Sequence, residues 1–360
     1  MRVALCHEWL GDRTGSEKTF EAMAMATPEA DLFALTWDRS SEFSFGGRCP
    51  TTTFLDRAPF LRRRRQWQLP LMPLAWRYAS RSAYDVVVTS SHACAKGFWP
   101  GRSALHLCYC YTPMRYVWLP EVDSRSRLRA FTSVPAAALR SWDRRSAGWV
   151  DGFAAISEAV RARIDRFYGR TAHVIHPPVD TDYFTLPAPG ADTKRDYALV
   201  VSRFVPYKRI DVALRACHAL RQPVVVAGAG PQEGALRALA AELDAAVEFV
   251  IGPSDEELRT LYREARALVF PADEDFGIVA VEAQACGTPV VGIASGGSLD
   301  TVVPEVTGAL VDGDIASIRE GLARVLERPP SAAVCRRHAE RFSTARFTTQ
   351  FRDWIEASTA

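Results

Sequence analysis

Short apolar runs alternate with segments of helical period along this chain, and this alternation limits its possible folds more than any other feature. The apolar runs are rich in β-branched and aromatic residues, which favours buried strands. Strands that alternate with helices predict parallel sheets covered by those helices. The predicted strands are Val3–Cys6, Asp31–Leu35, Asp85–Thr89, Ala104–Tyr111, Gly152–Ile156 and His173–Ile175 in the first half, and Tyr197–Val201, Val224–Ala227, Val247–Val250, Ala267–Phe270 and Pro289–Gly292 in the second. The sequence therefore predicts an α/β protein with two such arrays.

A break near the middle of the chain separates the two arrays. Pro177-Pro178 is followed by the Pro-, Gly- and Ala-rich stretch Leu186–Ala191, a composition typical of a linker. A chain of 360 residues is also long enough for two domains of ordinary size. We expect the boundary near residues 178–192, and assign residues 1–178 to an N-terminal domain and residues 179–343 to a C-terminal domain. A last segment of helical period, Thr344–Ser358, follows them.

The segment Phe270–Asp300 carries the strongest functional signal. Glu274 precedes a run rich in Ala, Val and Glu that is expected to be helical, and Glu282 lies within that run. A helix N-terminus offers unpaired N–H groups and a partial positive charge, which suits a phosphate. A carboxylate can accept two hydrogen bonds from a vicinal diol. Two glutamates beside a phosphate site therefore predict a clamp for a nucleotide sugar, whose phosphate-binding turn comprises Phe276, Gly277, Ile278 and Val279.

The same segment resembles that of a known family. The run from Glu274 to Glu282, EDFGIVAVE, is followed by AQACGTPVV and Gly296-Gly297, and it resembles the Glu-x7-Glu signature of retaining glycosyltransferases of family 4, which have the GT-B fold. The resemblance implies an α/β fold of two Rossmann-like, doubly wound domains facing across a cleft. It also implies an acceptor-binding N-terminal domain, a donor-binding C-terminal domain, and a C-terminal helix, residues 344–360, that packs back on the N-terminal domain.

Two further loops of the C-terminal domain fit a donor site. The loop after its first predicted strand resembles the R-x4-K site of the family, with Arg203 and Lys208 as the two cations. Cations fixed at a helix start can neutralise a diphosphate and stabilise the charge that develops as the sugar–phosphate bond breaks. Gly228 begins the Gly-Ala-Gly-Pro turn after the next strand, which is expected near the nucleotide. The resemblance implies that Glu274 contacts the sugar hydroxyls and Glu282 the ribose diol.

Two loops of the N-terminal domain are expected to reach the same ligand. The first, His7–Lys18, contains Gly15 and Ser16, where backbone amides can approach a diphosphate at a helix start; a plain connection is the alternative. The second, His106–Tyr116, has Tyr111 where relatives commonly carry a histidine before Thr-Pro. Tyr111 is expected to hydrogen-bond the sugar or the acceptor without acting as a base. The histidines that could serve instead are His7, His92, His106, His173 and His176.

Together with the segments HEWL, GSEK and SRFVPYKRIDVA, these motifs resemble a branch of the family that includes bacterial O-antigen and capsule mannosyltransferases. The resemblance implies transfer of mannose from GDP-mannose, with retention, to a lipid-linked or glycan acceptor in surface polysaccharide or lipopolysaccharide synthesis. It implies no cofactor and no metal, because GT-B members generally lack the metal-binding Asp-x-Asp. The alternatives are a transferase that uses a UDP-hexose, a nucleotide-sugar epimerase of the same fold, and a catalytically silent glycan-binding subunit. A silent subunit would be expected to have lost Lys208 or Glu282, and this chain keeps both.

Basic residues are concentrated in the N-terminal half. Residues 1–180 carry 25 Lys and Arg against 17 Asp and Glu, whereas residues 181–360 carry 19 against 25. Part of the excess lies in Arg62–Arg65, next to Trp67 and further aromatic residues. Basic residues with interleaved aromatics predict peripheral contact with an anionic membrane surface; a solvated basic loop beside an amphipathic core helix is the alternative. No nucleic-acid-binding motif accompanies the patch, so nucleic acid is not an expected partner.

Location and redox state follow from the remaining features. The chain has no run of eighteen apolar residues, and its start, MRVALCHEWLGD, is too short and too soon acidic for a signal peptide. We therefore expect a cytoplasmic protein, peripheral at the inner face of the cell membrane. Its eight cysteines include no C-x2-C pair, and Cys108 and Cys110 are expected to point to one face of a strand. Buried reduced thiols are favoured over a metal site.

Overall fold

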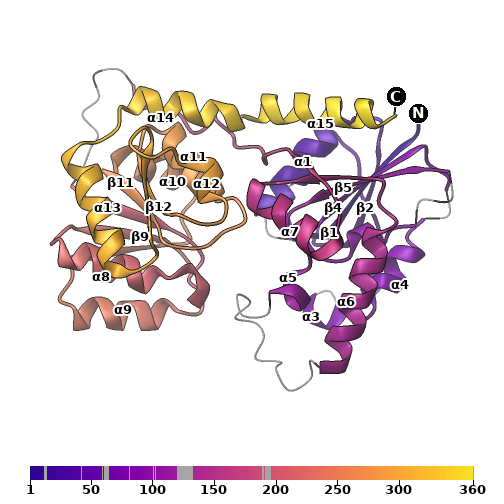
Figure 1. Cartoon of the computed structure of the whole chain (residues 1–360), viewed down its shortest axis with the longest axis horizontal. Coiled ribbons are helices and arrows are strands. Elements are labelled where there is room, and N and C mark those ends of the chain that lie inside the picture. Colours follow the sequence, from indigo (N-terminus) through magenta and orange to yellow (C-terminus); the bar gives the residue numbers. More distant parts are fainter. Residues whose placement is uncertain are drawn as a thin grey trace. The chain divides into compact units, whose positions relative to one another are not determined.

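A computed structural model describes residues 1–11, 14–41, 43–58, 60, 65–80, 82–99, 101, 103–119, 133–188, 190 and 196–359. The chain divides into two compact units: unit 1 consists of Met1–Pro178 and Ala345–Ala360, and unit 2 of Val179–Thr344. Each unit contains one parallel sheet with its own helices (Figure 1). The predicted α/β architecture of two Rossmann-like domains is confirmed.

Unit 1 is built on a seven-stranded sheet in the order β3-β2-β1-β4-β5-β6-β7, with all neighbours parallel. Both β1 and β4 are buried along their whole length, as strands covered on both faces must be. The strand order reverses between β1 and β4: β2 and β3 lie on one side of β1, and β4 to β7 lie on the other. The strands are β1 Val3–Leu10, β2 Asp31–Trp37, β3 Thr51–Thr52, β4 Val86–Ser91, β5 Leu105–Cys110, β6 Gly152–Ala155 and β7 His173–Val174.

The helices of unit 1 include the last helix of the chain. In this helix, Arg352 Nε donates to the carbonyl oxygen of Ala26 at 2.7 Å, and the Phe347 ring packs edge-on against Tyr109 with centroids 5.9 Å apart. Residues 345–359 thus complete the core of unit 1. The helices are α1 Gly15–Ala26, α3 Arg65–Gln68, α4 Met72–Arg77, α5 Arg115–Trp118, α6 Ser133–Ala147, α7 Glu158–Tyr168 and α15 Thr344–Thr359, with 3-10 helices η1 Phe54–Arg57 and η2 Ala95–Gly97.

Unit 2 has a six-stranded parallel sheet in the order β10-β9-β8-β11-β12-β13, which repeats the winding of unit 1. Its main apolar cluster joins the sheet to α8 and α13. The strands are β8 Ala198–Val201, β9 Val224–Gly228, β10 Val247–Ile251, β11 Ala267–Phe270, β12 Val290–Ile293 and β13 Gly308–Val311. The helices are α8 Ile210–Ala219, α9 Glu233–Glu242, α10 Asp255–Glu264, α11 Ile278–Ala285, α12 Ser298–Thr301, α13 Ile315–Glu327 and α14 Ala332–Ala339, with 3-10 helices η4 Pro206–Lys208 and η5 Glu340–Phe342.

The loop predicted to start at His7 begins later than expected. β1 continues through Leu10, so the polar His7 and Glu8 are strand residues, and both are fully buried. The strand continues there because the buried side chains of His7 and Glu8 are paired inside the unit with groups of β4 and the turn after it. By contrast, the predicted strand Ala104–Tyr111 corresponds to β5, so the segment from His106 to Cys110 is in a strand as expected.

Among the described helices, none combines the length and apolar character that crossing a bilayer requires.

Candidate functional site

The winding of each sheet sets where a ligand would bind. Doubly wound sheets bind ligands beyond the carboxyl ends of their strands, at the point where the strand order reverses. That point lies between β8 and β11 in unit 2 and between β1 and β4 in unit 1. The predicted site residues form one group in each unit. Arg203, Lys208, Gly228, Glu274, Phe276, Gly277, Ile278, Val279 and Glu282 belong to unit 2, and Gly15, Ser16 and Tyr111 belong to unit 1.

Lys208 and Glu274 form an ion pair in unit 2. Lys208 ends η4 after β8, Glu274 lies in the loop after the neighbouring strand β11, and Lys208 Nζ donates to Glu274 Oε1. Only 13% and 17% of the two side chains are exposed. Two residues far apart in sequence are thus brought into contact where the sheet reverses its order.

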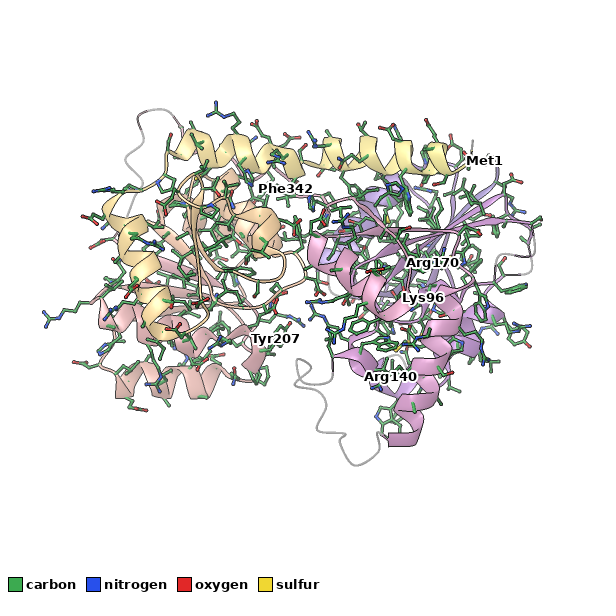
Figure 2. All side chains as sticks on the ribbon, in the orientation of Figure 1. Met1, Lys96, Arg140, Arg170, Tyr207 and Phe342 are labelled. Atoms are coloured by element: carbon green, nitrogen blue, oxygen red, sulfur yellow. The ribbon has the colours of Figure 1, made fainter. Side chains whose placement is uncertain are left out.

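Arg203 and Lys208 are linked through Tyr207, a residue that no sequence motif indicated. Arg203 Nη2 donates to the Tyr207 hydroxyl at 2.9 Å. The Lys208 ammonium lies 5.3 Å from the centre of the Tyr207 ring, a cation–π distance. Tyr207 (Figure 2) therefore holds the two predicted cations on one short loop.

Gly277 opens helix α11 in the left-handed region, with a φ of 89°. A Cβ at this position would lie 2.8 Å from the Phe270 ring, so a side chain is excluded by conformation and by space. No side chain caps this helix start, and the first amides of a helix have no partner within the helix. Ile278 and Val279 are half-buried in that first turn, and Phe276 just before it is buried against Phe342. The turn can offer N–H groups to an anion.

Glu282 lies one turn further along α11 and is held by Tyr262 on α10. The Tyr262 hydroxyl donates to Glu282 Oε2 at 2.8 Å, and Thr288 Oγ1 in turn donates to the Tyr262 carbonyl oxygen. Burial and the neighbouring Glu282 carboxylate raise the pKa of Tyr262 well above its ordinary value, so its hydroxyl stays a donor. Glu282 is 8% exposed. One of its oxygens is thus oriented by the protein, which suits a carboxylate that positions a diol.

Gly228 permits two loops of unit 2 to touch. A Cβ at Gly228 would lie 1.8 Å from the carbonyl oxygen of Ser202, so only glycine fits. The amide of Phe204 donates to the carbonyl oxygen of Ala229 at 2.9 Å, which joins the same two loops. The turn after β9 is therefore packed directly on the loop that carries Arg203.

Tyr111, Ser16 and Gly15 come together in unit 1. The Tyr111 hydroxyl donates to the Ser16 carbonyl oxygen at 3.0 Å, and its oxygen lies 2.9 Å from Ser90 Oγ. Burial raises the pKa of Tyr111 far above its ordinary value, and the Tyr111 residue is 8% exposed. A base role is therefore disfavoured, and the hydroxyl is committed to protein groups.

Glu8 and His92 form a second polar pair, near the carboxyl ends of β1 and β4. Glu8 is fully buried and accepts hydrogen bonds from the amides of Ala93 and Ala95 at 2.9 Å, while His92 Nδ1 lies 3.3 Å from its Oε2. Burial acts to raise the pKa of Glu8, but His92, His7 and the two amides outweigh it, and the pKa lies below its ordinary value. Glu8 is therefore a carboxylate, and its hydrogen bonds hold the turn after β4 in place.

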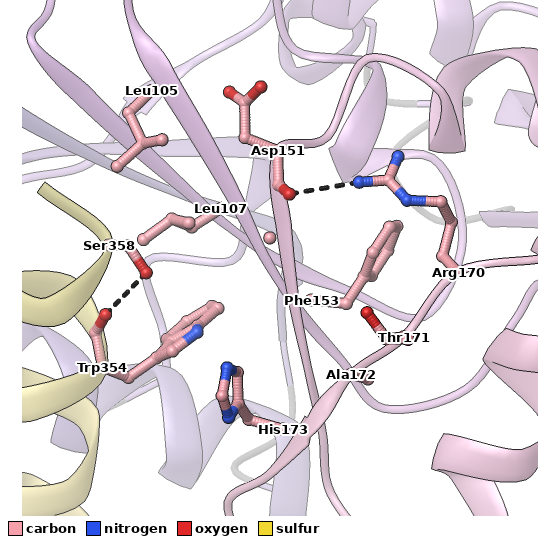
Figure 3. Close-up of a pocket in the computed structure, with 11 residues that line it drawn as sticks. Leu105, Leu107, Asp151, Phe153, Arg170, Thr171, Ala172, His173, Trp354 and Ser358 are labelled. Carbon is pink, nitrogen blue, oxygen red and sulfur yellow. Dashed lines mark hydrogen bonds between the residues drawn. The ribbon is translucent and has the colours of Figure 1, made fainter.

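Two of the alternative histidines lie at the amino ends of the strands, opposite to the carboxyl ends where a ligand would bind. His106 is near the amino end of β5, and His173 begins β7 and lines a cavity of about 400 Å³ with Phe153 and Trp354 (Figure 3). Arg170 in this cavity already donates to the carbonyl oxygens of residues 147, 150 and 151. Because the strands are parallel, the amino ends lie away from Tyr111, so this cavity does not belong to the predicted site.

The cysteine prediction holds for seven of the eight residues. All eight are free thiols, and seven are buried, but Cys49 is exposed. Of the predicted membrane segment, Arg62, Arg63 and Arg64 lie outside the described residues, and Arg65 begins α3. Trp67 on α3 is 56% exposed.

Two Rossmann-like, doubly wound parallel-sheet domains in one chain are the architecture of the GT-B fold class. Residues 19–183 match the family described as Glycosyltransferase Family 4, and residues 185–342 match Glycosyl transferases group 1. The chain belongs to this group 1 and family 4 class of glycosyltransferases.

Curated relatives and solved structures agree with that assignment. The D-inositol 3-phosphate glycosyltransferase of Mycolicibacterium smegmatis is 34% identical over 302 residues, 78% of this chain and 60% of the relative. The enzyme of the same name from Mycobacterium sp. strain KMS is 40% identical over 191 residues, 47% of this chain and 43% of the relative. The chain thus spans about half the length of the curated relatives it matches.

Among solved structures, sucrose-phosphate synthase from Thermosynechococcus elongatus has a TM-score of 0.80 at 20% identity, with 99% of each chain covered. Anabaena HepE in complex with UDP has a TM-score of 0.73 at 16% identity, covering 99% of this chain and 100% of the other. At these identities, the likeness concerns the fold.

Proposed function

We propose that the chain is a retaining hexosyltransferase that moves a sugar from a nucleotide-sugar donor, with GDP-mannose as the first candidate, to a lipid-linked or glycan acceptor in surface polysaccharide synthesis. The observation that carries the proposal is the Lys208–Glu274 pair in the loops after β8 and β11. A cation for phosphate and a carboxylate for sugar hydroxyls meet there, four residues before the start of a helix that no side chain caps.

The roles of the unit 2 residues follow from this arrangement. Arg203, Lys208 and the amides after Gly277 would hold the diphosphate and the charge it gains on leaving. Glu274 would contact the sugar hydroxyls, and Glu282 would accept from the ribose diol. The turn at Gly228, which packs on the Arg203 loop, would let the backbone approach the nucleotide. The buried Phe276 would stabilise the start of α11.

The transfer step would need no protein nucleophile. The bond between the anomeric carbon and the diphosphate oxygen breaks, and the acceptor oxygen bonds to that carbon on the same face. The acceptor proton passes to the departing diphosphate oxygen. Arg203 and Lys208 supply the positive charge that a metal provides in other transferases, so we propose that the reaction is metal-independent and uses no cofactor. In unit 1, Gly15 and Ser16 would approach the diphosphate and the rest of the unit would bind the acceptor.

A UDP-hexose is the second candidate donor. Anabaena HepE, whose fold this chain shares, was solved in complex with UDP and with UDP-glucose. The D-inositol 3-phosphate glycosyltransferases also place an inositol phosphate among the acceptor classes that merit testing.

A thermal-shift panel with GDP, UDP, ADP, GDP-mannose and UDP-glucose would test the proposal, because a ligand present at about 100 times its Kd stabilises the folded state by about 2.7 kcal/mol. The wild type would be compared with Lys208→Ala and with Glu282→Gln, which keeps an acceptor for Tyr262. Arg237→Ala, which removes an exposed pair with Glu233, is the control. A shift by GDP compounds that Lys208→Ala and Glu282→Gln lose supports the first donor. A shift by UDP compounds alone supports the second, and no shift with any nucleotide overturns the proposal in favour of a silent glycan-binding subunit.

Product analysis would separate transfer from epimerisation. A transferase converts donor and acceptor into an α-linked product, detected by the anomeric coupling constant, and releases the nucleoside diphosphate in equal amount. An epimerase would instead invert one stereocentre of the donor sugar and would consume no acceptor.

We also propose that unit 1 binds the inner face of the cell membrane peripherally, as a cytoplasmic enzyme with a lipid-linked acceptor would. The support is a run of large apolar side chains exposed around α3 and α4, whose members are Phe60, Trp67, Leu71, Leu74 and Tyr78. Co-sedimentation with anionic vesicles should weaken when Trp67 and Leu74 are both changed to Ser. Leu299→Ser in unit 2, where Leu299 is 57% exposed, should bind like the wild type. Equal binding by all three proteins would remove this part of the proposal.

A further inference from the structure

Three consecutive polar contacts run through unit 1 from β1 to the start of α1. His7 Nδ1 lies 3.0 Å from Ser90 Oγ, Ser90 Oγ lies 2.9 Å from the Tyr111 hydroxyl, and this hydroxyl lies 3.0 Å from the Ser16 carbonyl oxygen. The side chains come from or directly follow β1, β4 and β5, and His7, Ser90 and Tyr111 are all buried. The chain of contacts therefore crosses the point where the strand order of unit 1 reverses.

The carbonyl oxygen at one end fixes the direction of every proton in this chain. A carbonyl can only accept, so the Tyr111 proton is donated to Ser16. The Tyr111 oxygen must then accept from Ser90, whose own oxygen must accept from His7 Nδ1–H. His7 Nε2 is left as the unprotonated nitrogen, and it has no hydrogen-bond partner among the described residues. Burial lowers the pKa of His7 to about 4, so the ring is neutral and has one N–H to give.

The start of α1 is tied at several points, but the Tyr111 bond is the one in this set that comes from another element. Thr19 Oγ1 donates to the Gly15 carbonyl oxygen at 2.7 Å, and Ser16 Oγ donates to Glu17 at 2.8 Å. Both of these ties lie within α1, so they move with the helix. The bond from Tyr111 connects the same turn to the sheet.

We infer that Tyr111 is a positioning residue, which anchors the Gly15–Ser16 turn to the sheet through the ordered relay His7–Ser90–Tyr111–Ser16, and does not itself bind the sugar or the acceptor. The relay sets the direction in which the first amides of α1 point. Its consequence for the donor rests on the proposed function, in which this turn approaches the diphosphate.

Tyr111→Phe tests the inference, with Tyr109→Phe as a matched control. Tyr109 lies two residues earlier, is fully buried, and donates its hydroxyl to the Ile175 carbonyl oxygen at 2.9 Å. Each variant removes one buried hydroxyl from a tyrosine that donates to a backbone carbonyl. Only Tyr111→Phe releases the turn, so amide hydrogen exchange at Lys18 to Phe20 should become about fivefold faster in that variant alone, the loss expected for one hydrogen bond. Equal exchange in the two variants would overturn the anchor.

The proton order of the relay can be tested separately, from the position of the proton on the His7 ring. In the wild type at pH 7, the nitrogen-15 spectrum of the His7 ring should show the proton on Nδ1, and a proton on Nε2 would contradict the assigned order.

Kinetics decide what the anchor does for the donor. In Tyr111→Phe, the donor KM should rise about tenfold, whereas the acceptor KM and both constants of Tyr109→Phe should stay near wild type. A raised acceptor KM with an unchanged donor KM would assign Tyr111 to the acceptor and overturn the inference. A wild type that transfers no sugar would instead overturn the proposed function, while hydrogen exchange and the ring spectrum still decide whether the anchor exists.

Discussion

Two of the acidic residues of the candidate site are each held by one neighbouring side chain. Lys208 with Glu274 and Tyr262 with Glu282 each place one acidic group beside one donor, with most of each side chain buried. A buried or half-buried charge that loses its partner carries a desolvation cost, so the effects of substitutions within a pair are coupled.

Replacing Lys208 by Ala should lower kcat by roughly 100- to 1,000-fold, because a fixed cation that stabilises the leaving diphosphate is lost. Initial rates at saturating donor would measure this. The double variant with Glu274→Ala should be little slower than Lys208→Ala, since the two residues act as one unit. Arg237→Ala in the same unit should stay within twofold of wild type. A Lys208→Ala rate within fivefold of wild type would remove Lys208 from the transfer step.

The sequence could predict the motif residues of the candidate site, but it could not predict the residues that hold them in place. Arg203, Lys208, Glu274 and Glu282 stand in local patterns whose chemistry is visible without a structure. Their partners are distant or of ordinary type: Tyr262 precedes Glu282 by 20 residues, and Ser90 and Tyr111 are 21 residues apart. Only the packing of the folded chain brings such pairs together.

Short elements depend on a few unusual backbone positions. Helix α11 can begin directly under the site because Gly277 adopts a conformation that other residues avoid, and because the Phe270 ring occupies the space where a Cβ would lie. The sequence shows the glycine, but the contact with Phe270 required the structure.

Gly277→Ala should lower the free energy of unfolding of unit 2 by about 2 kcal/mol, the sum of a left-handed Cβ penalty and a clash. Gly234→Ala is the comparison, because Gly234 lies in α9 with nothing within 4 Å of its Cβ position. It should stabilise by about 0.5 to 1 kcal/mol. Urea unfolding followed by far-ultraviolet circular dichroism would compare the two. Equal effects would show that the α11 start tolerates a side chain.

Lys96 and Asp143 join four elements of unit 1. The Asp143 carboxylate accepts from Lys96 on η2, Trp118 on α5 and Tyr168 on α7, while lying on α6 itself (Figure 2 shows Lys96). Burial acts to lower the pKa of Lys96, but Asp143 outweighs it and the pKa is raised. Lys96 therefore stays charged inside the unit.

Lys96→Met should destabilise unit 1 by about 3 to 5 kcal/mol, because it leaves Asp143 buried without its cation. Arg161→Ala removes an exposed pair with Glu158 and should cost less than about 1 kcal/mol. Tryptophan fluorescence during urea unfolding is a suitable measurement, since all nine tryptophans of the chain lie in unit 1. Similar urea midpoints for the two variants would show that the hydrogen bonds from Trp118 and Tyr168 are enough to stabilise the buried Asp143 carboxylate.

Several elements that the sequence did not predict are short or unusually polar. α3 and α5 have four residues each and β3 has two, which is too few to display a period. The end of β1 contains His7 and Glu8, whose burial depends on partners from β4 and the turn after it. The long helix α15 is predicted from its helical period, because there the packing and the local preference agree.

Across the whole molecule, unit 1 should be the more acid-sensitive part. His7 and His106 are fully buried, and burial lowers the pKa of each to about 4. Between pH 6.5 and pH 4 the unfolded chain binds protons that these folded histidines do not, so stability falls as pH falls through that window. Glu8, with its lowered pKa, extends the loss to lower pH.

From pH 7 to pH 5, unit 1 should lose stability on the order of 3 kcal/mol, from two histidines that each contribute about 1.4 kcal/mol per pH unit. Tryptophan fluorescence would follow unit 1, and circular dichroism would follow both units. His106→Gln should reduce the loss by about half. A loss that is unchanged in His106→Gln would show that this histidine is not the source.

The assignment of residues 345–360 to unit 1 has a consequence during synthesis. The chain leaves unit 1 after Pro178 and returns only at Ala345, so unit 2 is an insertion within unit 1. Phe347, Phe351 and Trp354 fill buried positions of unit 1, yet the ribosome makes them after all of unit 2. Unit 2 can therefore fold as a contiguous piece first, while unit 1 begins earlier and finishes last. Any chain cut short within unit 2 keeps an uncovered apolar surface on unit 1, where aggregation would begin.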